Sequence, residues 1–411
     1  MSTSREDCLA LDARDPLAHA CARFAVPEGL IYLDGNSLGA LPKATPDRVA
    51  DVVAREWGKD LIQSWNKNGW IGMPEKLGAR IAKLIGVEDD EVVVADSTSI
   101  NLFKLAAAAV QAKAPRRVVL SEAGNFPTDL YVLQGLEKLL GGAIELKMVA
   151  RDKIADAIND DVALVALTHI HYKTGEIHDM AAINARAHEA GALTLWDLSH
   201  SAGAVDLALN RDGADLAIGC GYKYLNGGPG APAFVYVARH LQNELEQPLS
   251  GWMGHAAPFD FVDRYAPAQN MARFLCGTPV VLGMAALEEG LKTFDGIAMR
   301  DLRAKSIALG DLFLTLVEAR CGDAFRLACP RDGARRGSQV SLSHPEGYAI
   351  MQALIAGGVV GDFRSPDVIR FGFAPLYTRF ADIWDAVDRL AAIMDKAVWR
   401  QERFRIRAAV T

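Results

Sequence analysis

The stretch Gly219-Cys-Gly-Tyr-Lys-Tyr-Leu-Asn-Gly-Gly-Pro-Gly230 guides the interpretation of the whole sequence, because it places Lys223 in a glycine-rich turn. An apolar segment precedes this turn directly. A second apolar segment, Ala192-Leu-Thr-Leu-Trp-Asp197, ends in an aspartate 26 residues before the lysine. If both apolar segments are strands of one parallel sheet, the amine and the carboxylate follow strand ends at the same edge of that sheet.

A lysine and a carboxylate in this arrangement are what a pyridoxal phosphate (PLP) enzyme needs. The lysine holds the cofactor aldehyde as a Schiff base, and the carboxylate keeps the pyridine nitrogen protonated, so that the ring withdraws electrons from a carbanion. The two residues taken alone also fit a surface lysine in a loop and an aspartate that caps a helix. The residues around them favour the PLP interpretation.

Composition restricts the class of protein further. The chain has 411 residues, 50% of them hydrophobic, which predicts two domains or a large α/β domain with an appendage. The net charge of −7 and the absence of a basic tract argue against nucleic acid or an anionic membrane as a partner. No apolar run reaches the roughly 18 residues of a membrane span, and the first residues lack an apolar signal region.

The six cysteines are scattered and form no Cys-x-x-Cys pair. Neither a zinc site nor a disulfide framework is indicated, so we expect no metal. Reduced thiols of this kind predict a cytoplasmic protein.

Short β-branched segments alternate with amphipathic helical segments between residues 91 and 240. This alternation predicts an α/β fold, with a mostly parallel sheet between helices. Helices are expected over 100–112, 130–140 and 180–190, and seven strands over 91–95, 117–121, 144–149, 162–168, 193–197, 216–219 and 234–237.

The chain is predicted to have three parts. Residues 1–60 form an N-terminal arm and helix that belong to the small domain, with a short strand over 30–33. Residues 61–285 form the large domain, and 286–411 form a smaller C-terminal α+β domain. The elements expected late in the chain are helices over 283–294, 302–320 and 380–399, and strands over 339–343 and 368–373.

Two polar turns follow predicted strands. Ser97, Thr98 and Ser99 begin a helix, where free N–H groups and the helix dipole attract an anion such as a phosphate. Taken alone they fit plain N-capping, and it is the presence of Lys223 that favours a phosphate site. Phe126 can stack on a pyridine ring, with Asp129 hydrogen-bonding nearby. A proline-containing turn that merely enters a helix is the alternative for this second motif.

Histidines near the predicted strand ends allow two interpretations. His200 follows Asp197 by three residues and either packs against a cofactor or bonds the backbone at a helix start. His169, His171 and His178 could instead form a metal cluster, which would make the protein a metal hydrolase.

Arg370 lies in an otherwise apolar strand. Its planar fork fits the α-carboxylate of a substrate, and a salt bridge to a local acid is the alternative.

Taken together, these motifs resemble the kynureninase family, PLP-dependent hydrolases of the aspartate aminotransferase superfamily (fold type I). The resemblance is closest to the bacterial enzymes and runs essentially end to end. The matching segments are 32–39, 99–104, 125–129, 172–175, 196–204, 222–230, 248–252 and 370–373.

The resemblance implies a role for each matching residue. Lys223 would be the Schiff-base lysine, Asp197 the partner of the pyridinium, and Tyr222 a phosphate ligand and proton relay; these three make up the predicted catalytic set. Arg370 would take the substrate carboxylate and Phe126 would stack on the ring. The other implied cofactor contacts are Thr98, Ser99, Asp129, Thr168 and His200, with Trp252 and Thr278 reaching in from a second subunit.

The implied reaction is hydrolysis of the Cβ–Cγ bond of L-kynurenine to anthranilate and L-alanine, in tryptophan catabolism, with 3-hydroxykynurenine as a further substrate. The implied assembly is a homodimer with shared active sites. Alternatives are another fold type I enzyme, such as an aminotransferase or a cysteine desulfurase, although Cys321 and Cys329 lie in no obvious motif for a desulfurase nucleophile. A binding protein without catalysis would be expected to lack Lys223 or Asp197, and both are present.

Overall fold

Seven strands form the central sheet of the large domain in the computed structural model, which describes residues 3–407. They are β2 (Val92–Val94), β3 (Val118–Glu122), β4 (Glu145–Val149), β5 (Val162–Thr168), β6 (Leu193–Asp197), β7 (Leu216–Cys220) and β8 (Ala233–Val237). Their order is β2-β8-β7-β6-β5-β3-β4, and each pairing is parallel except the two that β8 makes. The predicted mostly parallel seven-stranded sheet is therefore confirmed, with every strand end within one residue of its predicted position.

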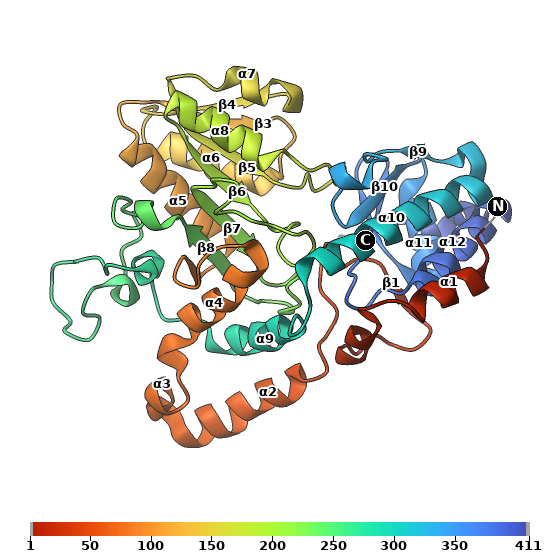
Figure 1. Cartoon of the computed structure of the whole chain (residues 1–411), viewed down its shortest axis with the longest axis horizontal. Helices are drawn as coiled ribbons and strands as arrows, with labels where there is room; N and C mark the ends of the chain where they lie inside the picture. The colour runs from red at the N-terminus through yellow and green to blue at the C-terminus, as the bar shows by residue number, and fades with distance from the viewer. Residues whose placement is uncertain (1–2, 408–411) are drawn as a thin grey trace.

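Helices pack around this sheet (Figure 1). The helices of this region are α4 (Met73–Ile85), α5 (Thr98–Ala112), α6 (Pro127–Leu139), α7 (Ile154–Ala157) and α8 (Met180–Ala190). Helix α5 contacts the strands from β5 to β8, and α6 packs on α5. All seven residues of β5 are buried, which explains why its sequence is a continuous apolar run and not an alternating one.

A second, smaller sheet belongs to the C-terminal part of the chain. Its antiparallel order is β12-β13-β10-β9, and its strands are β9 (Arg326–Leu327), β10 (Gln339–Ser343), β12 (Asp362–Arg364) and β13 (Val368–Gly372). The helices of this part are α10 (Met299–Cys321), α11 (Gly347–Ala356) and α12 (Phe380–Asp395).

The start of the chain joins this small domain. Helix α1 (Arg5–Asp12) packs on α12, where Arg5 Nε lies 2.7 Å from Asp385 Oδ1. Strand β1 (Ile31–Tyr32) pairs in parallel with β11 (Val359–Val360). Figure 1 shows α1 and β1 beside the C-terminal helices.

Between β1 and the large domain, the chain forms an arm whose individual helices were not predicted from the sequence. It consists of α2 (Thr45–Asp51), a π-helical segment (Val52–Asp60) and α3 (Ser64–Lys67). The helix α2 packs on α9 (Val281–Lys292), where Arg48 contacts the carboxylates of both Glu56 and Glu288.

The buried apolar side chains form two cores, one around the large sheet and one around the small sheet. The division at residues 60 and 285 stays a prediction. Within residues 3–407, no helix combines the length and the apolar character that crossing a membrane requires.

Candidate active site

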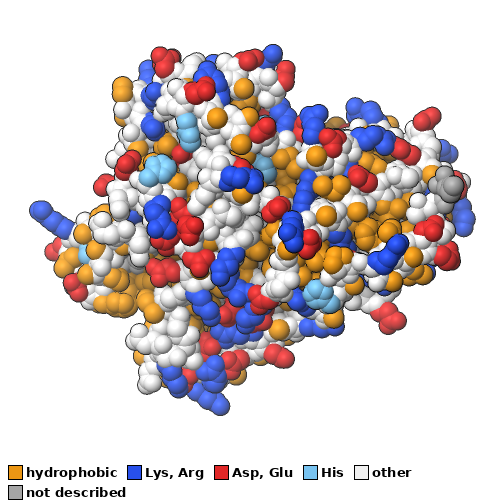
Figure 2. Space-filling model, viewed as in Figure 1, with side chains coloured by type: hydrophobic (Ala, Val, Ile, Leu, Met, Phe, Trp, Pro, Cys, Tyr) orange, Lys and Arg blue, Asp and Glu red, His pale blue; other side chains and the backbone are white. Residues whose placement is uncertain are grey.

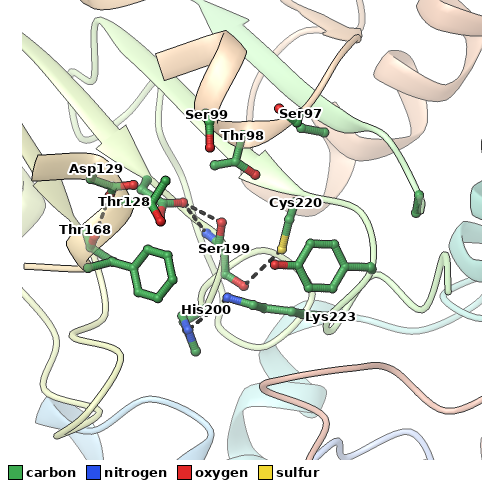
Figure 3. A pocket seen from close by; sticks show the side chains of 15 residues that line it. Ser97, Thr98, Ser99, Thr128, Asp129, Thr168, Ser199, His200, Cys220 and Lys223 are labelled. Carbon is green, nitrogen blue, oxygen red and sulfur yellow. Dashed lines mark hydrogen bonds between the residues drawn. The ribbon is translucent and has the colours of Figure 1, made fainter. Parts of the chain in front are cut away.

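A cavity of about 310 Å³ opens at the carboxyl ends of β5, β6 and β7 (Figure 3). Nine of the twelve site residues predicted from the sequence line it: Thr98, Ser99, Phe126, Asp129, Thr168, Asp197, His200, Tyr222 and Lys223. Ser97, from the predicted anion-binding turn, also lines the cavity. The sequence-based site did not include the other lining residues, Thr128, Ser199, Cys220, Ala231 and Ala233. In Figure 3, Thr98 and Ser99 lie at one end of this space, and Lys223 and His200 lie at the other.

Strand register brings the acidic side of the cavity together. Thr168 and Asp197 end neighbouring parallel strands and are direct register partners. The Thr168 hydroxyl lies 2.5 Å from Asn125 Oδ1 and 3.1 Å from Asp129 Oδ2. The turn after β3 is thereby tied to the ends of β5 and β6.

Asp197 is buried beneath the cavity. Its Oδ1 accepts hydrogen bonds from the backbone N–H of Ser199, at 2.8 Å, and from the Ser199 hydroxyl, at 2.6 Å. Burial raises the pKa of Asp197, and Ser199 and the charge of Lys223 offset this only in part. The Asp-x-Ser spacing is the sequence signal by which Ser199 could have been found, because an aspartate commonly bonds the backbone two residues on.

Asp129 lies behind the same end of the cavity. Burial, followed by the negative charge of Asp197, raises the pKa of Asp129 well above its ordinary value. A nearby positive charge therefore determines whether both carboxyl groups can be ionised.

Lys223 projects into the cavity from the turn after β7. Its Nζ lies 3.1 Å from His200 Nε2 and 5.8 Å from the centre of the Phe126 ring. Burial, and then the charge of Lys223, holds the pKa of His200 well below its ordinary value, so the imidazole is neutral at pH 7. His200 Nδ1 is buried and makes no hydrogen bond within the described residues 3–407.

The glycine-rich turn around Lys223 is supported by the N-terminal segment. The N–H of Gly39 donates to the carbonyl of Tyr222 at 2.8 Å. A Cβ on Gly39 would lie 2.4 Å from the carbonyl oxygen of Lys223, so only glycine allows this close approach. Asn226 adopts the left-handed conformation (φ 58°), and its N–H closes the turn onto the Lys223 carbonyl at 2.9 Å.

The opposite end of the cavity is the N-terminus of α5. Ser97 caps this helix, with its hydroxyl 3.4 Å from the N–H of Ile100. Thr98 and Ser99 occupy the first turn and line the cavity. Hydroxyls and free N–H groups at the positive end of a 15-residue helix are groups that can bind an anion.

Arg370 does not line this cavity, and its side chain is only 1% exposed. Its guanidinium forms a two-point ion pair with Asp362, in which Nε lies 2.6 Å from Oδ1 and NH2 bonds Oδ2. NH1 donates to the carbonyl of Tyr172, and NH2 lies 3.3 Å from the Ser37 hydroxyl. Asp362 is therefore the local acid of the salt-bridge alternative that the sequence left open. Burial would raise the pKa of Asp362, but Arg370 brings it below its ordinary value.

Trp252 and Thr278 also lie outside the cavity lining. The Trp252 ring packs against Phe259, with centres 5.6 Å apart, and Phe261, with centres 6.4 Å apart. The three aromatic rings line a surface groove of about 540 Å³ together with Ile62, Trp65, Asn66 and Ile71. Figure 2 shows hydrophobic side chains exposed at the left of the molecule, where Figure 1 draws the long loops that follow β8.

The three histidines of the metal alternative bond to different partners. His169 Nδ1 lies 2.9 Å from the Ser201 hydroxyl, and His178 Nε2 lies 2.8 Å from Glu122 Oε2. His171 Nε2 bonds the carbonyl of Gly124 at 3.0 Å. In the part of the chain that the structure describes, no group of three or more His, Cys, Asp or Glu side chains is arranged to hold a metal ion.

Solved structures resemble this chain in fold. An apo cysteine desulfurase from Thermococcus onnurineus NA1 superposes with a TM-score of 0.77 at 18% identity, over 92% of this chain and 98% of that one. A variant of the cystine lyase C-DES, with glycine covalently linked to its PLP cofactor, superposes with a TM-score of 0.78 at 16% identity, over 90% and 98%. Both show the predicted fold type I architecture.

Sequence comparison is more specific than the fold. Residues 302–390 match the model of the kynureninase C-terminal domain. The kynureninase of Pseudomonas fluorescens is 53% identical over 100% of both chains, and that of Burkholderia mallei (strain SAVP1) is 52% identical over 99% of this chain and 100% of its own. Identity of this extent along the whole length shows that the chain belongs to the kynureninase family.

Proposed function

We propose that this protein is a PLP-dependent kynureninase that hydrolyses the Cβ–Cγ bond of L-kynurenine to anthranilate and L-alanine. The observation that carries the proposal is the single cavity in which Lys223, Asp197, Phe126 and the N-terminus of α5 meet. A lysine amine, a buried carboxylate, an aromatic face and an anion site are the four groups that PLP requires. Full-length similarity to curated kynureninases supports the choice of reaction.

The residues of the cavity fit this cofactor. Asp197 is a buried acid with a raised pKa, so a protonated pyridine nitrogen beside it would be the positive partner that keeps it ionised. His200 presents a buried Nδ1 that makes no bond within residues 3–407. When bound, PLP supplies an aldehyde for the lysine amine and an electron-withdrawing ring that stabilises negative charge at the substrate Cα.

The phosphate group would lie at the end of the cavity formed by α5. Thr98 and Ser99 would donate hydroxyl hydrogen bonds there, beside free backbone N–H groups. Tyr222 lines the same cavity, and burial raises the pKa of its phenol, so it remains a proton donor at neutral pH. We therefore assign Tyr222 to the phosphate and to proton delivery late in the reaction.

Lys223 would move the proton at the substrate Cα once its amine is free. The neutral imidazole of His200, 3.1 Å from Nζ, accepts a hydrogen bond from the amine and orients it. Because His200 carries no charge at pH 7, it does not repel a positive lysine. A general base within hydrogen-bond reach of its proton is the geometry this step needs.

Arg370 would bind the α-carboxylate of the substrate through one edge of its guanidinium. Asp362 occupies the edge formed by Nε and NH2. The edge formed by NH1 and NH2 contacts only neutral groups, the Tyr172 carbonyl and the Ser37 hydroxyl. A carboxylate that displaced these neutral acceptors would form a charge-assisted pair with the free edge.

The proposal includes a homodimer with shared active sites, to which Trp252 and Thr278 contribute from the second subunit. The exposed apolar groove beside Trp252 supports it, because large exposed apolar patches mark interaction surfaces. Two inactive variants, Lys223→Ala and Trp252→Ala, should recover activity when mixed, because each heterodimer would contain one intact site. Heterodimers that form and remain inactive would contradict shared sites.

A cysteine desulfurase activity is not favoured. Burial raises the pKa of the Cys321 thiol to about 11 and also raises the pKa of Cys329. Neither thiol is therefore primed as a nucleophile at neutral pH. The cytoplasmic location expected from the sequence stays a prediction.

The test is direct. PLP added to the protein should give a visible absorbance band that borohydride removes, and the loaded protein should release anthranilate from L-kynurenine. The ratio of kcat/KM for L-kynurenine and 3-hydroxykynurenine would then settle which substrate is preferred. A PLP-loaded protein that leaves both substrates intact would contradict the proposed reaction.

A further inference from the structure

Lys104, on α5, is a buried lysine next to the candidate active site. Its side chain has no exposure to solvent, and its ammonium donates to two groups on different segments. Nζ lies 2.7 Å from Asp96 Oδ2 and 2.6 Å from the carbonyl oxygen of Phe274. A buried ammonium requires such partners, because an unpaired charge in the interior is strongly destabilising.

The first partner controls the entry into α5. Asp96 adopts the left-handed backbone conformation (φ 47°), which non-glycine residues rarely adopt. It directly precedes Ser97, the residue that caps α5, and its carbonyl accepts from the N–H of Ala233 at 2.9 Å. The ion pair with Lys104 thus holds the turn that aims Ser97, Thr98 and Ser99 at the cavity.

The second partner belongs to the segment that carries Thr278. Two residues after Phe274, the carbonyl of Cys276 accepts from the N–H of Met253 at 3.2 Å. A Cβ on Gly251 would lie 2.2 Å from that same carbonyl oxygen, so the two segments are in close backbone contact around Trp252. One ammonium therefore connects the anion end of the cavity to the segments that carry Trp252 and Thr278.

We propose that Lys104 is a positioning residue that fixes the phosphate-binding end of the cavity relative to the Trp252 and Thr278 segments. This inference rests on the proposed function, because it assigns the α5 N-terminus to the PLP phosphate. Without the ammonium, Asp96 loses its ionic partner and Phe274 loses a donor. The turn before α5 is then free to relax, and its hydroxyls and N–H groups no longer converge on one anion.

The test separates the phosphate from the rest of the cofactor. Apo-protein of the Lys104→Met variant is titrated with PLP and with pyridoxal, which lacks the phosphate. Because the hydroxyls and N–H groups at the α5 N-terminus would no longer converge on the phosphate, we expect PLP affinity to fall about tenfold or more. Pyridoxal affinity should change little, so the ratio of PLP affinity to pyridoxal affinity should fall.

Lys305→Met is the matched control. Lys305 is also buried (5% exposed), and its ammonium also binds one carboxylate, Asp15 at 2.6 Å, and one carbonyl, Pro375 at 2.6 Å. It lies on α10 and does not line the cavity. Both variants should lower the thermal midpoint, and only Lys104→Met should change the PLP to pyridoxal ratio.

Asp96→Asn provides a second route if Lys104→Met does not fold. Asparagine tolerates the left-handed conformation and removes only the charge, so the ratio should fall in the same direction by a smaller factor. An unchanged ratio in whichever variants fold would overturn the role of Lys104. If the unsubstituted protein fails to bind PLP at all, the proposed function itself fails, which is a different outcome.

Discussion

Arg370 and Asp362 form a two-point ion pair in which both side chains are almost completely buried, with exposures of 1% and 3%. The pair fixes the guanidinium plane, and the edge formed by NH1 and NH2 bonds the neutral Tyr172 carbonyl and Ser37 hydroxyl, which the carboxylate of the proposed substrate would displace. Arg370→Lys keeps the charge and loses the planar fork. Loss of the two-point contact with the carboxylate should cost about 2–5 kcal/mol of binding free energy. We therefore expect kcat/KM for L-kynurenine to fall roughly 30-fold to several thousand-fold, with PLP affinity unchanged.

Arg336→Lys is the control for this prediction. Arg336 is equally buried, and its NH2 lies 2.6 Å from Asp311 Oδ1, yet it does not line the cavity. The Arg336→Lys variant should have a lower thermal midpoint and a near-normal KM for L-kynurenine. The same pattern from Arg370→Lys would mean that the Asp362 pair is structural only.

Lys223→Ala should abolish covalent attachment of PLP. Borohydride followed by mass spectrometry of peptides should find the cofactor on Lys223 in the unsubstituted protein and on no peptide of the variant. Lys173→Ala removes a different lysine, whose Nζ lies 5.9 Å from the centre of the Tyr172 ring, and should leave the adduct in place. An adduct that persists in Lys223→Ala would move the covalent role to another lysine.

Gly39→Ala should disturb the lysine turn from outside the cavity. The added Cβ would lie 2.4 Å from the Lys223 carbonyl oxygen and 2.6 Å from Asn226 Oδ1, so one segment must shift. We expect weaker PLP binding in titrations and slower turnover. Gly135→Ala, in α6, meets nothing within 4 Å and should retain PLP affinity and turnover. Normal PLP binding by Gly39→Ala would show that the turn does not depend on this contact.

The buried histidines predict sensitivity to acid. Burial lowers the pKa of His169 to about 3, whereas an unfolded histidine titrates near 6.5. Between these values the unfolded state binds more protons, so stability falls as the pH falls from about 6.5 towards 3. Each such histidine contributes at most about 1.4 kcal/mol per pH unit.

His169→Gln keeps a polar group facing Ser201 and removes this titration. The free energy of unfolding, measured in urea from about pH 6 down to pH 4, should therefore fall less steeply with acid. The exposed His240 provides the control, and His240→Gln should leave the slope as it is. An unchanged slope in His169→Gln would mean that other groups dominate the acid response.

Sequence reasoning located the large sheet because its strands are strongly encoded. The strand from Val162 to Thr168 is a continuous apolar run bounded by polar turns, and parallel strands buried on both faces have this pattern. The residues that follow these strands lie in one cavity because the carboxyl ends of parallel strands lie at the same edge of the sheet. The placement of Asp197 and Lys223 in one cavity could therefore be predicted from the sequence.

The remaining features depend on contacts between distant segments. The strand β1 lies inside the short strand expected over 30–33, but its partner β11 was not predicted, because the two strands are more than 300 residues apart and two residues carry no readable periodicity. The partner of Arg370 lies in the three-residue β12, which was not predicted. The π-helical segment over Val52–Asp60 has an ordinary helical sequence, so its extra residue per turn was not foreseen.

The pairing of β1 with β11 and the packing of α1 on α12 have a consequence for how the polypeptide matures. The large domain is in effect inserted between the two chain segments that build the small one. During synthesis the large sheet can form while the small domain still waits for its last helix. The newly made N-terminal segment therefore remains without its docking surface until the ribosome has delivered nearly the entire chain, and truncation at either terminus should damage the same domain.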